Sequence, residues 1–421
     1  MSTDNGTSVS FQSSTPHGID SVYAWMRLAV AVLLSTIGGV GMWSVVVVLP
    51  AVQSEFGIAR ADASLPYTMT MIGFGVGGVL MGKLVDRFGI VLPVVLGATL
   101  LGLGYITSAQ STGIFQFGLL QGLLIGVGTS TTFAPLVADT SLWFVKRRGA
   151  AVGIIASGNY LAGAVWPPVV QYFVQAVGWR ETHIGIAVFC VCAMLPLAML
   201  LRRRAPLVEP AAAMAFGGSL PMRPLGLAPA TLQWLLVIAG IACCVAMAMP
   251  QVHLVAYCSD LGYGAARGAE MLSLLLACGI ISRLIFGWIS DHNGGLRTLL
   301  LGSALQALAL CLYLFSDGLM SLYLISALFG LFQGGIVPAY AIIVREYFSP
   351  KEAGARIGII MMATMFGMAF GGWMSGVIFD WTGSYQTAFV HGIIWNLLNL
   401  SIVGWLLRLA IKRQLVVSIA G

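Results

Sequence analysis

A short polar segment decides the fold of this chain: Gly82-Lys83-Leu84-Val85-Asp86-Arg87-Phe88-Gly89. It interrupts two long uncharged runs, because no charged residue occurs between Asp62 and Lys83 or from Phe88 to Ala138. An α-helix needs about 20 apolar residues to cross the hydrocarbon core of a bilayer. The segment therefore predicts a loop between membrane-spanning helices.

The composition supports a lipid environment for the whole chain. Of its 421 residues, 58% are hydrophobic and 9% are charged, whereas soluble domains carry about 25% charged residues. This excludes a soluble enzyme, a disordered protein and a coiled coil. The net charge is +6, and the basic residues lie between apolar spans. We therefore expect these residues to face anionic lipid rather than nucleic acid.

The uncharged windows give twelve spans, arranged six plus six. We expect a disordered cytoplasmic tail over 1–22, a six-helix bundle over 23–201, a linker over 202–229, a second bundle over 230–410 and a tail over 411–421. With a cytoplasmic N-terminus, 17 of the 21 Lys and Arg residues fall inside, Arg27 among them, and three fall outside, namely Arg60, Arg180 and Arg267. This bias places both termini in the cytoplasm.

The two halves repeat with a spacing of about 205 residues. Gly82-Lys83-Leu84-Val85-Asp86 matches Gly287-Trp288-Ile289-Ser290-Asp291, and Gly178 matches Gly383. Such an internal duplication is typical of transporter folds. It predicts an all-α integral membrane protein with two pseudo-symmetric bundles and a central cavity.

The segment at 82–89 resembles the loop signature of the major facilitator superfamily, with a weaker second copy ending at Asp291. The resemblance implies a transporter rather than an enzyme, without a cofactor or metal. It also implies a latch, in which Asp86 meets a helix of the other half starting near Gly354 and Asp291 meets one starting near Gly149. An ordinary helix-end charge is the alternative. The expected latch residues are Gly82, Asp86, Arg87, Gly89, Gly287, Asp291, Lys146, Arg147 and Arg148.

A second pattern, from Trp143 to Arg180, resembles monocarboxylate transporters and the related oxalate/formate exchangers. Arg283 fits the same resemblance, because those families carry an arginine four residues before the glycine that Gly287 matches. Arg283 also precedes Asp291 by eight residues, about 12 Å along a helix, which places it well inside the hydrocarbon core. Burying its charge costs at least ~2.5–3.5 kcal/mol, so it should face a watery cavity or a partner, with snorkelling as the alternative. In those families the matching arginine binds the substrate carboxylate.

The remaining residues narrow the substrate. Thr364 stands where the resemblance implies a lysine in oxalate exchangers, so a small monocarboxylate of the 2-hydroxy or 2-oxo type is favoured, and Thr364 could hydrogen-bond to it. Gly279 stands where animal-type members carry an aspartate. His253 is therefore the best candidate proton carrier, with a structural hydrogen bond as the alternative.

Three further cavity candidates are Asn159, Tyr340 and Trp43, each with core packing as the alternative. We expect a functional monomer in a membrane, with the bacterial inner membrane favoured, that moves a small organic anion and a proton by alternating access. Anion exchange is the first alternative, and drug or metabolite efflux is the second. A membrane-embedded enzyme would need clustered catalytic residues, and the five histidines are scattered.

Overall fold

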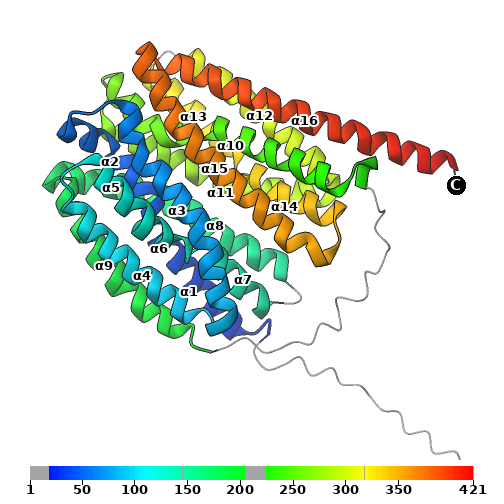
Figure 1. Cartoon of the computed structure of the whole chain (residues 1–421), viewed down its shortest axis with the longest axis horizontal. Helices are drawn as coiled ribbons and strands as arrows, with labels where there is room; N and C mark the ends of the chain where they lie inside the picture. The colour runs from blue at the N-terminus through cyan, green and yellow to red at the C-terminus, as the bar shows by residue number, and fades with distance from the viewer. Residues whose placement is uncertain (1–18, 145–146, 204–223, 317, 421) are drawn as a thin grey trace, which may run out of the picture.

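The computed structural model describes residues 19–144, 147–203, 224–316 and 318–420. Within these ranges every regular element is helical (Figure 1). The first half contains α1 (Val22–Gly38), α2 (Val40–Phe56), α3 (Arg60–Phe88), α4 (Val91–Ala109), α5 (Ile114–Leu120), the π-helix η1 (Gln121–Gly126), α6 (Val127–Ser130), α7 (Ala134–Trp143), α8 (Arg148–Val177) and α9 (Trp179–Leu200). The second half contains the 3-10 turn η3 (Pro224–Gly226), α10 (Pro229–Asp260), α11 (Ala265–Asn293), α12 (Gly295–Leu314), α13 (Leu319–Gln333), α14 (Ile336–Tyr347), α15 (Pro350–Thr382) and α16 (Tyr385–Ala420).

Some of the membrane crossings consist of two or more consecutive helices. Among the described residues, 11 helical segments are long and apolar enough to span a membrane, including α1 with α2, α5 through α7, and α13 with α14. The 30-residue helix α8 is not one of the 11, and its middle carries polar Ser157 and Asn159 and the pair Pro167-Pro168. The structure thus supports 11 or 12 crossings, against the 12 predicted.

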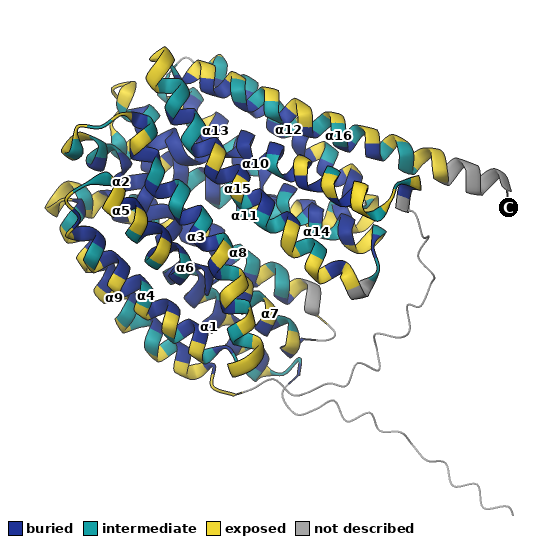
Figure 2. Ribbon diagram, viewed as in Figure 1, coloured by how far each residue is buried: buried dark blue, intermediate teal, exposed yellow. Residues whose placement is uncertain are grey.

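The helices form two groups that follow the chain, with α1 to α9 in one and α10 to α16 in the other (Figure 1). One buried apolar cluster runs from Ala24 to Leu201 within the first group. The other is centred on the second group, and it reaches into the first through residues such as Trp43 and Tyr67. Figure 2 shows the buried residues along the interior faces and the exposed ones on the outside.

The predicted repeat is visible in the backbone. Three helices of the first half end at glycines with positive φ, and their counterparts in the second half do so 205 residues later. The pairs are Gly57 and Gly262, Gly89 and Gly294, and Gly178 and Gly383. Glycine is favoured there because it adopts positive φ without a steric penalty. The repeat spacing that the motifs predicted is therefore confirmed at the helix ends.

The predicted tails and linker lie partly outside the described residues. Residues 1–18 of the first tail and 204–223 of the linker are not described, while α1 begins at Val22 and α10 at Pro229. The predicted tail over 411–421 is mostly helical, because α16 continues to Ala420 and projects past the other helices (Figure 1). The last helix is thus longer than the sequence analysis expected.

One basic residue counted among the cytoplasmic loops is in fact buried. Arg27 in α1 is 3% exposed, and its Nε and Nη2 donate to the Asp139 carboxylate at 2.9–3.1 Å. Its Nη1 donates to the carbonyl oxygens of Leu201 and Arg203. Because buried charges require partners, this cluster ties α1, α7 and the end of α9 together.

Candidate functional site

The two groups of helices meet along two seams, α3 against α15 and α8 against α11, with α2 also contacting α10. We call the end of the molecule where α1 begins and α16 ends the proximal end, and the opposite end the distal end. α3, α11 and α16 begin at the distal end, and α2, α10 and α15 finish there. The seams therefore run from one end to the other.

Charged groups close the distal end across the two halves. The Asp380 carboxylate, at the end of α15, accepts the backbone N–H groups of Arg60 (2.8 Å) and Ala61 (2.7 Å), which open α3. A carboxylate at a helix N-terminus is stabilised by the unsatisfied N–H groups there. The Arg60 side chain also donates to both oxygens of Asp260, each at 2.9 Å. Arg60, one of the three basic residues predicted to lie outside, thus joins the two halves.

The glycines along the seams show that the halves diverge away from this contact. Near the distal end, a Cβ added at Gly376 would lie 2.9 Å from the Arg60 carbonyl oxygen, and one at Gly372 would lie 3.1 Å from the Tyr67 ring. Toward the proximal end, an added Cβ meets no described atom within 4 Å at Gly78, Gly82, Gly153, Gly287, Gly354 and Gly358. The seam is thus tight distally and open proximally.

Arg283 lies where the tight part of the α8–α11 seam gives way to the open part. One turn before it, a Cβ at Gly279 would overlap the Tyr160 ring of α8, whereas one turn after it Gly287 is open. The guanidinium carbon lies 4.0 Å from the centroid of the Tyr160 ring, and Nη1 donates to the Ala156 carbonyl oxygen at 2.7 Å. The Nε is buried and has no hydrogen-bond partner among the described residues.

Interrupted helices support the wall of this site. The chain breaks between α13 and α14 at Gly334-Gly335. There a Cβ at Gly334 would lie 2.8 Å from the Cβ of Ser282, and one at Gly335 would overlap Phe286. The first half breaks at the matching place, between α6 and α7. Matched interruptions in the two halves are typical of transporter binding sites.

The other predicted site residues fall into separate groups. Trp43 and Asn159 meet, because the indole N–H donates to the Asn159 carbonyl oxygen at 3.2 Å. The Asn159 amide nitrogen contacts the Met42 sulfur at 3.8 Å. Tyr340 and Thr364 both face Gly240, at 3.9 and 3.3 Å from its added Cβ. Both are fully buried within the second half.

His253 lies near the distal end and is fully buried. Its Nε2 donates to the Gly372 carbonyl oxygen at 2.8 Å, since a carbonyl can only accept. Its Nδ1 lies 3.3 Å from the Tyr385 hydroxyl, which therefore donates to it in the neutral ring. Among the described contacts none joins His253 to Arg283, and a role of His253 as proton carrier stays a prediction.

Among the residues that the structure describes, the predicted latch contacts do not occur. Asp86 and Asp291 are both exposed, and neither has a hydrogen bond or ion pair to any described residue. Arg87 lies over the ring of its neighbour Phe88, at 5.2 Å, and Arg147 is exposed. Lys146 and the side chain of Arg148 lie outside the described residues. The latch remains a prediction for a conformation closed at the proximal end.

Sequence reasoning missed Tyr160, which contacts Arg283 from the other half. The residue was visible in the quoted pattern beside Asn159, but 123 positions separate it from Arg283. It also missed the pair formed by Gln251 and Gln333, whose side chains hydrogen-bond at 2.8 Å within the core. Within the described ranges no cluster of three or more His, Cys, Asp or Glu could hold a metal ion.

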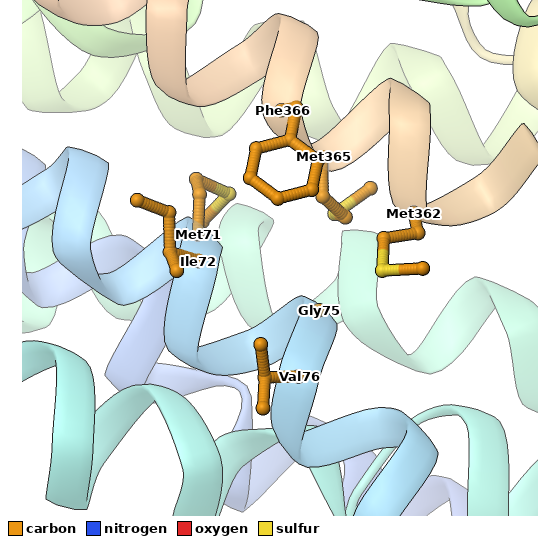
Figure 3. A pocket seen from close by; sticks show the side chains of 7 residues that line it. All are labelled: Met71, Ile72, Gly75, Val76, Met362, Met365 and Phe366. Atoms are coloured by element: carbon orange, nitrogen blue, oxygen red, sulfur yellow. The ribbon is translucent and has the colours of Figure 1, made fainter. Parts of the chain in front are cut away.

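A small pocket opens in the other seam. Figure 3 shows its lining, which is Met71, Ile72, Gly75 and Val76 from α3 and Met362, Met365 and Phe366 from α15. None of these side chains offers a hydrogen-bond donor to an anion. Val76 and Phe366 are 45% and 47% exposed. The pocket therefore does not resemble a carboxylate site.

Sequence similarity to known proteins places the chain in a family. The residue pattern of the Major Facilitator Superfamily matches residues 31–321 and 271–416. Monocarboxylate transporter 13 of Rattus norvegicus is 26% identical, over 78% of this chain and 75% of that protein. The Agnestins efflux protein AgnL12 of Paecilomyces divaricatus is 25% identical, over 80% and 76%.

Solved structures show the same fold at low sequence identity. A bacterial homolog of the human lysosomal transporter Spinster, in an inward-facing and occupied conformation, has a TM-score of 0.75 at 13% identity, covering 93% of this chain and 98% of that one. The peptide transporter POT with alafosfalin has a TM-score of 0.70 at 15% identity, covering 91% and 95%. The chain belongs to the major facilitator superfamily, in a branch like that of the monocarboxylate transporters.

Proposed function

We propose that the protein is a secondary active transporter for a small monocarboxylate of the 2-hydroxy or 2-oxo acid type. The observation that carries the proposal is the position of Arg283, at the point where the two halves begin to separate. A permanently charged guanidinium at bilayer depth is expected to serve a substrate or an ion. Relatives named monocarboxylate transporters support the same substrate class.

The unused edge of Arg283 suits a carboxylate. Nη1 is occupied by the Ala156 carbonyl, whereas Nε has no acceptor among the described residues. The Nε and Nη2 donors point in parallel from one edge of a guanidinium, which matches the two oxygens of a carboxylate. The single positive charge of Arg283 is neutralised by a monoanion, whereas a dianion would need a second cation.

Among the four remaining candidates, Asn159 is best placed to bind the hydroxyl or oxo group. It directly precedes Tyr160, and among the described residues its amide nitrogen has no acceptor stronger than the Met42 sulfur. Thr364 and Tyr340 already have partners inside the second half, the Met361 carbonyl at 2.7 Å and the Asn399 amide at 3.0 Å. The Trp43 indole is bonded to the Asn159 backbone. These three would need to rearrange to meet a substrate.

Alternating access would rock the two halves about Arg283. The described conformation is closed distally through Arg60, Asp260 and Asp380 and open proximally. In the opposite conformation, Asp86 and Asp291 would latch the proximal end. With the charge bias of the loops, the proximal end is cytoplasmic in our proposal. The protein would then work as a monomer in a plasma membrane, the bacterial inner membrane in the first instance.

Uptake into proteoliposomes tests the substrate class. Vesicles containing the protein receive labelled lactate or pyruvate, with unlabelled lactamide, oxalate and larger organic acids as competitors. We expect uptake of the monocarboxylates and no competition by lactamide, which keeps the shape but lacks the charge. Equal competition by lactamide, or transport of oxalate alone, would contradict the proposal. Preference for a larger acid, moved outward, would favour efflux, the function for which the relative from Paecilomyces divaricatus is named.

A further inference from the structure

The charge of Arg283 has no carboxylate partner in the described part of the chain. Five ion pairs occur there, and Arg283 belongs to none of them. Asp139, the acid that interrupts the long uncharged run of the first half, is already paired with Arg27. The groups that hold Arg283 are the Tyr160 ring and the Ala156 carbonyl oxygen, and both are neutral.

Tyr160 also fills the place from which an acid could reach Arg283. Residues four apart on a helix lie on the same face, so position 279 is one from which a carboxylate could pair with Arg283. Position 279 is a glycine, and a Cβ there would overlap the Tyr160 ring. The ring therefore replaces a counter-charge with a π face, which attracts a cation without neutralising it.

This arrangement has a consequence for the transport cycle, given that the proposed function is right. In an occluded state without substrate, Arg283 would be a lone cation shielded from water, which is unfavourable. With a monocarboxylate bound, the same state holds a neutral pair. The loaded protein should therefore change conformation much faster than the empty one.

Histidine protonation does not supply the missing charge. A proton symporter returns empty most easily when the group that released the proton is left as an anion beside the cation. His253 changes only between neutral and positive, and its described contacts are to Gly372 and Tyr385. We infer that this transporter is an obligatory carboxylate exchanger, and that Tyr160 is the positioning residue that holds Arg283 without a counter-charge.

Trans-acceleration tests the inference on the wild-type protein. Vesicles are filled with unlabelled lactate or with buffer alone, the membrane potential is clamped at zero, and initial uptake of labelled lactate is measured. We expect uptake at least about tenfold faster into the filled vesicles. The reason is that an unpaired arginine in a bilayer costs more free energy than a tenfold difference in rate requires. We also expect no accumulation in buffer-filled vesicles under an inward proton gradient.

The possible results separate the two proposals. Equal rates into both kinds of vesicle, or proton-driven accumulation in buffer-filled ones, would overturn the exchange inference and leave the proposed function standing. Absence of uptake in either would overturn the proposed function, and the inference with it. A binding assay on the same preparation confirms that the protein is folded.

Two variants test the role of Tyr160. The double change Tyr160→Ala with Gly279→Asp makes room for a carboxylate one turn before Arg283, and we expect the ratio of filled to buffer-filled uptake to fall toward one. Tyr160→Phe keeps the ring face and should keep the wild-type ratio. Because the ratio compares one protein with itself, a loss of folded protein does not change it. A double variant that still transports with the wild-type ratio would contradict the role of Tyr160.

Discussion

Replacing Asp380 with alanine should open the distal end of the protein. The carboxylate accepts two backbone N–H groups of α3 across the seam, at 2.8 and 2.7 Å. Asp380 is exposed, so we take the range for a helix N-cap, about 1–2 kcal/mol, rather than that of a buried charge. This corresponds to a shift of roughly 5- to 30-fold in the balance between the distally closed and open states.

Distance measurements between spin labels can detect this shift. Labels at Ser54 and Gln386, both exposed at the distal end of opposite halves, would be introduced after replacement of the seven cysteines. We expect Asp380→Ala to enlarge the long-distance population. Asp62→Ala is the matched control, because it removes an exposed acid from the same first turn of α3. The reasoning fails if Asp380→Ala leaves the distances unchanged, or if both variants shift them equally.

Two further predictions concern packing inside each half. Asp139→Ala leaves Arg27 buried without its counter-charge and should lower the free energy of unfolding by about 3–5 kcal/mol. Denaturation in detergent micelles measures this loss, and a loss below about 1 kcal/mol would show that the pair does not stabilise the fold. Gly335→Val drives a side chain into Phe286 and should cost about 1–3 kcal/mol. Gly358→Val, at an open position, is its control, and equal losses from the two changes would argue against close packing at the break.

Much of the architecture could be predicted because it depends on local sequence. The uncharged runs located the spans, and glycines 205 residues apart mark equivalent helix ends in the two halves. The breaks at 131–133 and 334–335 were missed because threonine and glycine barely lower the hydropathy of a window. The signal was present in Gly334-Gly335 followed by Pro338, since glycine and proline favour helix interruption.

The contacts between distant residues could not be predicted in the same way. Arg27 and Asp139 are 112 positions apart, and Arg60 and Asp380 are 320 apart. Nothing in either local sequence shows which charges will meet when the helices pack. Arg283 was identified because a charge inside a span is costly wherever it lies. Its partner Tyr160 became visible only once α8 and α11 were placed side by side.

Binding of a labelled monocarboxylate to purified Arg283 variants tests the central claim most directly. Arg283→Gln removes the charge but keeps hydrogen-bond donors, and Arg283→Lys keeps the charge but loses the planar fork. Arg202→Gln removes an exposed arginine outside the proposed substrate site and the predicted latch. We predict that Arg283→Gln abolishes measurable binding, that Arg283→Lys weakens it at least about tenfold, a loss of about 1.4 kcal/mol, and that Arg202→Gln binds like the wild type. Wild-type affinity in Arg283→Gln would contradict the account.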